Sequence, residues 1–263
     1  MNFIRTKDGA RIAYDISGSG PTIVFSHCLG GSRAVWTPVI ERLKDRFRCI
    51  AYDLRGQGDS EATPGPYSMA LLADDALELL DALELESCIF AGVSMGGMVA
   101  QHLALLAPQR LSAIVLADSA AGFDAAGRAA WADRITQLQR EGIAPLVDTM
   151  MGRWFTEEFR RQNPALVTKV AAILARTDLN GYLANCAAIR DHDLAKRLPE
   201  IALPTLVLCG ENDPSTPLSL SQDLAAGISG AQLAVLPGLN HLPCFEAPEL
   251  VSGVIENFLQ AHQ

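Results

Sequence analysis

Short apolar runs alternate with longer segments of helical periodicity along most of the chain. The runs are largely apolar throughout instead of alternating with polar positions, which is typical of strands buried on both faces of a parallel sheet. They occupy residues 22–25, 48–52, 88–93, 113–116, 205–208 and 233–236. Residues 12–16 follow a turn at residues 7–9 and are expected to form the second arm of an opening hairpin. The pattern predicts an α/β fold with a mostly parallel, eight-stranded sheet flanked by helices.

The segments between these runs carry the spacing of amphipathic helices. In residues 68–83, Ser68 is a favourable N-cap. The apolar side chains of that segment recur along one stripe, at Leu72, Ala76, Leu79, Leu80 and Leu83. Residues 97–107 predict a second helix, which ends at Pro108.

The alternation breaks between residues 120 and 199, where helical patterns follow one another without a strand between them. This segment holds two of the three tryptophans, and Pro199 marks its end before the strand pattern resumes. The sequence therefore predicts a core domain of residues 1–119 and 200–263. Residues 120–199 are predicted to form an inserted helical cap subdomain.

Composition and charge exclude several classes of function. The chain has 263 residues with 21 Lys and Arg against 30 Asp and Glu, so its net charge of −9 works against binding nucleic acid. The first residues lack the apolar segment of a secretory signal, and no later segment is long and uncharged enough to span a bilayer. We therefore expect a cytoplasmic protein. The six cysteines show no metal-binding spacing, so we expect structural thiols, no metal and no cofactor.

The sequence GVSMGG at residues 92–97 carries the candidate chemistry. A buried strand is predicted before it and a helix after it, and that context holds a serine hydroxyl clear of the sheet. Gly92 and Gly96 fit because a sharp strand-to-helix turn leaves no room for Cβ atoms. Ser94 is therefore the candidate nucleophile, and it needs a base to accept its proton.

His241 is the candidate base, because it follows the last predicted strand in a loop at the carboxyl edge of the sheet. Asp213, in the loop after residues 205–208, is the favoured acid and completes the chain order Ser, Asp, His. Asp118, after residues 113–116, and Glu211 are alternative acids. Among the remaining histidines, His102 is expected to be packed or exposed and His192 to lie at the surface.

An oxyanion hole requires two backbone N–H donors. The residue after the nucleophile, Met95, supplies one, and Leu29 is the candidate for the other because its loop follows the strand at residues 22–25. His27 is expected to shape this loop. Cys28 is expected to be a structural thiol.

These motifs resemble the α/β-hydrolases. The resemblance rests on HCLGG at residues 27–31, YDLRGQGDS at 52–60, GVSMGG at 92–97, GENDP at 210–214 and the loop of His241. A finer resemblance, over nearly the whole chain, is to the 3-oxoadipate enol-lactonases of aromatic degradation. It is carried by residues 64–68, 94–98, 153–156, 181–182 and 185–191.

The resemblance implies cofactor-free hydrolysis of a small enol-lactone that bears a carboxylate. Trp131 and Trp154 are candidates to line the pocket, and Arg190 is the favoured partner for a substrate carboxylate, with Arg153 and Arg134 as alternatives. Phe123 lies in a stretch, AAGF, where these lactonases tend to have Ala-Arg-Ile-Gly, which leaves a different lactone or ester open. A carboxylesterase, a C–C bond hydrolase, a perhydrolase and a non-catalytic ligand receptor also stay open, as does a homo-oligomer.

Overall fold

A computed structural model describes residues 1–262. Its strands form one eight-stranded sheet with the order β1-β2-β4-β3-β5-β6-β7-β8. Their bounds are β1 Asn2–Arg5, β2 Arg11–Ser17, β3 Thr22–Ser26, β4 Arg48–Tyr52, β5 Cys88–Val93, β6 Leu111–Ala117, β7 Thr205–Gly210 and β8 Gln232–Leu236. Every apolar run that predicted a strand lies within one of these strands, so the predicted sheet is confirmed.

The sheet is parallel from β4 to β8, and β2 is antiparallel to both of its neighbours. The carboxyl ends of β3, β5, β7 and β8 therefore meet at one edge of the sheet. The candidate oxyanion loop leaves this edge after β3. The connections after β5, β7 and β8 carry Ser94, Asp213 and His241.

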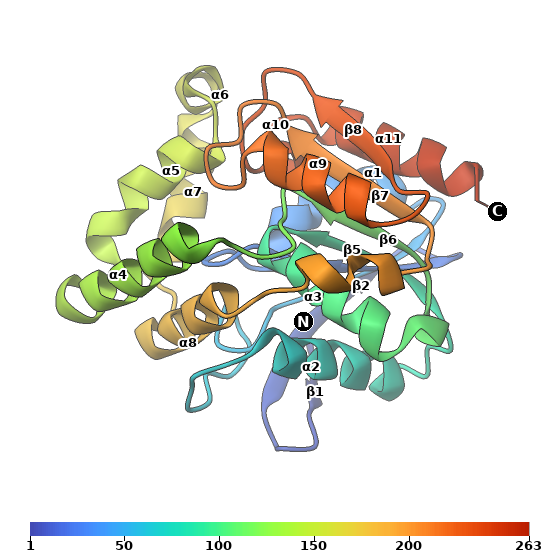
Figure 1. Cartoon of the computed structure of the whole chain (residues 1–263), viewed down its shortest axis with the longest axis horizontal. Coiled ribbons are helices and arrows are strands. Elements are labelled where there is room, and N and C mark those ends of the chain that lie inside the picture. Colours follow the sequence, from blue (N-terminus) through green and yellow to red (C-terminus); the bar gives the residue numbers. More distant parts are fainter. Residues whose placement is uncertain (263) are drawn as a thin grey trace.

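Helices flank the sheet on both faces (Figure 1). Helix α1 packs against α11, and α2 packs against α3. The bounds of the helices outside the β6–β7 connection are α1 Thr37–Leu43, α2 Met69–Ala82, α3 Met95–Leu106, α9 Leu218–Gly227, α10 Pro243–Glu246 and α11 Pro248–Gln260, with short 3₁₀ helices η1 Arg33–Trp36 and η2 Pro108–Arg110. Ser68 caps α2 as predicted, because its side chain accepts a hydrogen bond from the backbone N–H of Leu71 at 3.1 Å.

Five α-helices lie between β6 and β7, and we call them the inserted helices. Their bounds are α4 Ala125–Glu141, α5 Val147–Trp154, α6 Glu157–Gln162, α7 Pro164–Ala175 and α8 Leu179–Arg190, with η3 Ala144–Leu146 and η4 Ala195–Glu200. Figure 1 shows them grouped together at the left, beside the end of the sheet. No helix within residues 1–262 is both long and apolar enough to cross a membrane.

Helix α8 makes a close backbone contact with the loop after β4. A Cβ atom added at Gly181 would lie 2.3 Å from the carbonyl oxygen of Gly56. Asn185 also donates a hydrogen bond of 2.9 Å from its Nδ2 to the carbonyl oxygen of Arg55. Because a side chain at Gly181 would push the two backbones apart, α8 is seated directly on the loop after β4.

The prediction that residues 233–236 are buried on both faces is wrong. Leu233 and Val235 are 38% and 39% exposed. The reason is topological, since β8 pairs only with β7 and forms the edge of the sheet. An apolar run alone does not distinguish an edge strand from a central one.

Candidate active site

Ser94 occupies a strained turn between β5 and α3. Its backbone has φ 57° and ψ −115°, a conformation that a residue with a side chain rarely adopts. Two hydrogen bonds hold it there: the N–H of Ser94 donates to the carbonyl oxygen of Ala117 at 2.8 Å, and Ser119 Oγ donates to the carbonyl oxygen of Ser94 at 2.8 Å. The neighbouring strand β6 and the loop after it therefore fix the position of the serine.

The glycines around Ser94 are required by close backbone approach, as the sequence predicts. A Cβ atom at Gly92 would lie 2.1 Å from the carbonyl oxygen of Gly96. A Cβ atom at Gly96 would lie 2.3 Å from the carbonyl oxygen of Ser26 in β3. Neither distance is possible between real atoms, so the turn excludes side chains at both positions.

His241 and Asp213 come together from the loops after β8 and β7. His241 Nδ1 lies 2.7 Å from Asp213 Oδ2, and both residues are buried. Because Nδ1 carries the proton in this hydrogen bond, Nε2 of the neutral ring is left free to accept a proton. Within residues 1–262, no hydrogen bond joins Ser94 Oγ to His241, although both residues line the same cavity.

The carboxylate of Asp213 is held by its own loop. The N–H groups of Ser215 and Thr216 donate to Oδ1 at 2.7 and 3.1 Å, and Thr216 Oγ1 donates to Oδ2 at 2.5 Å. Burial acts to raise the pKa of Asp213, but His241 and these hydrogen bonds outweigh it and hold that pKa below its ordinary value. Asp213 is therefore placed as a charged partner for the imidazole.

Asp118, the alternative acid, lies in the same cluster but has different partners. One oxygen each of Asp118 and Asp213 and a ring nitrogen of His241 lie within 4.8 Å of one another. Asp118 Oδ1 accepts a hydrogen bond from the N–H of Gly210 at 2.8 Å, whereas Oδ2 is buried without a hydrogen-bond partner among the described residues. The hydrogen bond to His241 thus belongs to Asp213.

The loop after β3 leaves the N–H group of Leu29 free. The N–H of Gly30 donates to the side-chain oxygen of Gln57, and the N–H of Gly31 to the carbonyl oxygen of Cys28. In the described chain, the N–H groups of Leu29 and Met95 have no hydrogen-bond acceptor. Leu29 also lines the cavity that contains Ser94. These are the two backbone donors that the sequence predicts for an oxyanion hole.

His27 and Cys28 have structural surroundings. His27 is fully buried, its Nδ1 donates to the carbonyl oxygen of Cys28 at 2.7 Å, and its Nε2 accepts from the N–H of Leu54 at 3.0 Å. Burial raises the pKa of the Cys28 thiol to about 12, so it carries no nucleophilic thiolate near neutral pH. All six cysteines are buried and free.

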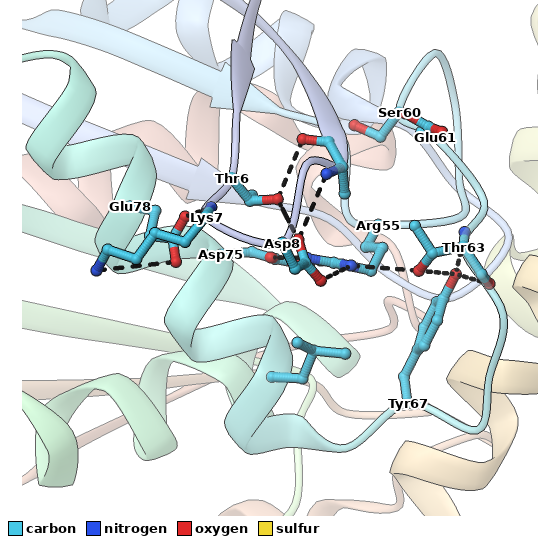
Figure 2. A network of polar contacts seen from close by, with 12 residues as sticks. Thr6, Lys7, Asp8, Arg55, Ser60, Glu61, Thr63, Tyr67, Asp75 and Glu78 are labelled. Carbon is cyan, nitrogen blue, oxygen red and sulfur yellow. Dashed lines mark hydrogen bonds and ion pairs between the residues drawn. The ribbon is translucent and has the colours of Figure 1, made fainter.

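A buried ion-pair network fixes the loop that carries Gln57 (Figure 2). Arg55, only 2% exposed, donates from Nη1 to Asp8 Oδ2 at 2.6 Å and from Nε to Asp75 Oδ2 at 2.8 Å. Arg55 Nη1 also lies 3.2 Å from the hydroxyl of Thr63. The network joins the turn after β1, the loop after β4 and helix α2, so the loop cannot move without breaking a buried charge pair.

The cavity beside Ser94 is small, about 60 Å³, and side chains of the inserted helices line part of it. Its lining combines the candidate catalytic residues with apolar and cationic side chains, and it consists of Cys28, Leu29, Ser94, Met98, Phe123, Trp131, Arg134, Met150, Arg153, Trp154, Ile189, Ser215, Thr216 and His241. No acidic side chain is among these described residues. The structure thus brings Trp131 and Trp154 to the cavity.

The fold and the sequence together identify the family. The sequence profile of the α/β hydrolase fold matches residues 21–248. The chain belongs to the α/β hydrolase family.

Relatives within this family include enol-lactonases. The 3-oxoadipate enol-lactonase 2 of Acinetobacter baylyi is 34% identical over 90% of this chain and 87% of its own length. The crystal structure of the enol-lactonase from Burkholderia xenovorans LB400 is 31% identical, with a TM-score of 0.94 over 98% of this chain and 100% of that one. A hydrolase from Pseudomonas aeruginosa PA01 is 37% identical, with a TM-score of 0.94 over 98% of this chain and 97% of the other.

Arg190 lies apart from the cavity of this α/β hydrolase. Its guanidinium pairs with Asp191, at 2.7 Å from Nη2 to Oδ2, and lines a separate hollow with Pro66 and Ala187. Arg134 and Arg153, the two alternatives, are the arginines that line the cavity. Arg134 Nη2 donates to the hydroxyl of Tyr182 at 2.8 Å, and its guanidinium lies 4.9 Å from the centre of the Trp131 ring.

His102 and His192 form a pair outside the active site. His102 Nε2 lies 3.2 Å from His192 Nδ1, and His192 Nε2 lies 3.0 Å from the carbonyl oxygen of Ala120. The prediction of a surface position for His192 is wrong, because its side chain is buried between α3 and the start of the inserted segment. Its hydrogen bonds show that it is a packing residue.

Three supporting residues were not predicted as part of the site. Gln57, Ser119 and Thr216 hold the Leu29 loop, the Ser94 turn and the Asp213 carboxylate through hydrogen bonds. Each bond depends on a loop conformation that residue spacing does not determine. Only the position of Gln57 in the YDLRGQGDS motif marked it as part of a pattern.

Proposed function

We propose that this α/β hydrolase opens a small lactone, or cleaves a small ester, through an acyl-enzyme. The observation that carries the proposal is the hydrogen bond of 2.7 Å between His241 Nδ1 and Asp213 Oδ2 beside the cavity that Ser94 lines. It leaves the other ring nitrogen free to act on the serine hydroxyl.

In the first half of the reaction, Ser94 Oγ attacks the carbonyl carbon while His241 Nε2 takes the hydroxyl proton. The negative oxygen that forms is stabilised by the N–H groups of Leu29 and Met95. As the carbon–oxygen bond of the leaving group breaks, His241 returns the proton to that oxygen. Asp213 stays charged and stabilises the imidazolium throughout.

In the second half, a water molecule gives a proton to His241 and attacks the acyl carbon. The bond to Ser94 Oγ then breaks and the serine regains its proton from His241. A lactone leaves as a single product because both halves of the cleaved bond belong to one molecule. The residues present supply every proton transfer, so this mechanism requires no metal or cofactor.

The cavity favours an anionic substrate. Arg134 and Arg153 place positive charge beside Ser94, with no acidic side chain among the described lining residues. Arg134 Nε is buried without an acceptor in residues 1–262, which a substrate carboxylate would satisfy. We therefore propose residues 120–199 as a substrate cap and a carboxylate-bearing lactone, such as a 3-oxoadipate enol-lactone, as the substrate.

A panel of lactones and p-nitrophenyl esters, with and without a carboxylate, tests this proposal. Ser94→Ala should lower kcat by at least about a thousandfold on every active substrate. The matched control Ser229→Ala changes an exposed serine after α9 and should keep the wild-type rate. Full activity of Ser94→Ala would overturn the mechanism. Equal kcat/KM for substrates with and without a carboxylate would overturn the substrate class while leaving the mechanism in place.

A further inference from the structure

Asp118 lies at the junction of the elements that carry the acid and the base. Its N–H donates to the carbonyl oxygen of Leu208 in β7 at 2.7 Å, and its Oδ1 accepts from the N–H of Gly210 at 2.8 Å. A Cβ atom at Gly210 would lie 2.1 Å from the carbonyl oxygen of Asn240, the residue before His241. Asp118 is thus bonded to the point where the Asp213 and His241 loops cross.

The backbone of Asp118 is also unusual. Its φ is 45°, in the left-handed region that few residues other than glycine occupy. Asp tolerates this region better than most residues, but the conformation still carries strain. It turns the side chain toward the cluster with Asp213 and His241, whose ligand atoms lie within 4.8 Å of one another.

The second oxygen of Asp118 lacks what a carboxylate needs. Oδ2 is buried and accepts no hydrogen bond from the described residues, and the whole residue is 0% exposed. An ionised carboxylate would leave a buried negative oxygen unpartnered beside a second carboxylate, at high cost in free energy. Asp213 already holds the donors that stabilise a charge, from His241, Thr216 and Ser215.

We propose that Asp118 is a positioning residue held as a neutral carboxylic acid, with its hydroxyl directed toward Asp213. The two carboxyl groups then carry a single negative charge, and that charge stays on Asp213 opposite His241. The neutral acid fixes the crossing of the two loops without competing for the imidazole. This inference rests on the proposed function, because it assigns Asp213 as the charged acid.

The charges around Asp118 also favour its neutral form, because they raise its pKa. Burial raises the pKa of Asp118 well above its ordinary value, and the negative charge of Asp213 raises it further. Glu246 on α10 adds to this effect, whereas the N–H of Gly210 opposes it. The other titratable groups that face Asp118 are His241, Cys209 of β7 and Cys244 of α10. Both thiols are neutral near pH 7, because burial raises their pKa values.

Infrared difference spectroscopy on the full-length protein at neutral pH tests the proton directly. The wild-type spectrum should contain the carbonyl band of a protonated carboxylic acid, which Asp118→Asn removes. Persistence of the acid band in Asp118→Asn, or its absence from the wild type, would overturn the proposal. The measurement needs no turnover, so it is independent of whether Ser94 is the nucleophile.

A mutant cycle on ester hydrolysis gives the second test. Asp118→Asn alone should lower kcat by less than about tenfold and leave the pH midpoint of the acid limb of kcat/KM unchanged. In the Asp213→Asn background, the same substitution should lower kcat by a factor at least about ten times larger. Asp118 is then the carboxyl group that remains beside His241 in this cluster. An equal fold-decrease in kcat in both backgrounds would overturn the proposal. So would a fall in the acid-limb midpoint of about one unit in Asp118→Asn, which would show that a negative charge had been removed.

Discussion

The side-chain oxygen of Gln57 accepts a hydrogen bond from the backbone N–H of Gly30. This contact joins the loop after β4 to the loop after β3, and it occupies the N–H group next to Leu29. Leu29 lines the cavity, and its N–H has no acceptor among the described residues. A buried glutamine thus holds the backbone group next to this free donor.

Gln57→Leu is expected to lower kcat by about tenfold or more, with a smaller change in KM. The substitution keeps the bulk of the side chain but leaves the N–H of Gly30 without its acceptor, so the Leu29 donor loses its position. Steady-state kinetics on a p-nitrophenyl ester measure the effect. Gln222→Leu, at an exposed position of α9, is the control and should match the wild type. An unchanged kcat in Gln57→Leu would show that the loop holds its shape without this bond.

His241→Ala should reduce kcat nearly as much as Ser94→Ala does. The two residues act on the same proton, so losing either one removes the same step, and the double variant should be little worse than each single one. Rates of the three variants on one ester give the comparison. A rate close to that of the wild type in His241→Ala would indicate a different base.

Arg134→Met should raise KM by about tenfold or more for a lactone with a carboxylate and leave a neutral lactone nearly unaffected. Methionine keeps much of the apolar stem but removes the charge that faces the cavity. Arg190→Met is the matched control, because that guanidinium lies outside the cavity and pairs with Asp191. If Arg190→Met instead produced the selective loss, the substrate carboxylate would have to bind in the other hollow.

Gly96→Ala and Gly253→Ala should change stability in opposite directions. A Cβ atom at Gly96 would meet the backbone of Ser26, and that backbone cannot move without disturbing β3. The variant should lose several kcal/mol or fail to fold. At Gly253, within α11, a Cβ atom would have no neighbour within 4 Å, so alanine should stabilise the helix by about 0.5–1 kcal/mol. Urea unfolding measures both, and a stable Gly96→Ala would contradict the steric argument.

The His102–His192 pair should make stability fall at acidic pH. Burial lowers the pKa of His192 from 6.5 to about 4, and the neighbouring His102 adds to this. Burial, with Arg197, lowers the pKa of His102 to about 4 as well. Because the folded-state pKa lies below the unfolded one, the stability is complete above about pH 6.5 and is lost as the pH falls toward 4.

For His192 alone this loss amounts to about 3 kcal/mol. Urea unfolding between pH 7 and 4 should therefore show a shallower dependence on pH in His192→Asn than in the wild type. His262→Asn, at an exposed position, should retain the wild-type slope. Identical slopes in His192→Asn and the wild type would exclude this histidine as the source.

The sequence determined the sheet and the nucleophile turn because both depend on local pattern. Strands buried on both faces are apolar throughout, and a strand-to-helix turn around Ser94 needs small residues at fixed positions. The pairing of His241 with Asp213 was also predictable, since both follow strands whose carboxyl ends share an edge. The exposure of β8 was not predictable, because it depends on β8 being the edge strand of the sheet.

Which face of an inserted helix lines the cavity could not be predicted from the sequence. Ile189 lines the cavity, whereas Arg190, the next residue of α8, faces a different hollow. Adjacent residues on a helix point about 100° apart, so one residue of error in helix phase exchanges the two surfaces. The phase of α8 is set by its contact with the loop after β4, which lies more than a hundred positions earlier in the chain.

The contact between Gly56 and Gly181 affects which helices could be exchanged to change substrate selectivity. Because α8 packs directly on the loop that holds Arg55 and Gln57, it belongs structurally with the hydrolase core. The arginines and tryptophans that face Ser94 come from α4 and α5 instead. A hybrid protein that imports a new selectivity should therefore exchange α4 to α7 and keep the recipient's own α8, so that the loop of Arg55 and Gln57 keeps its support.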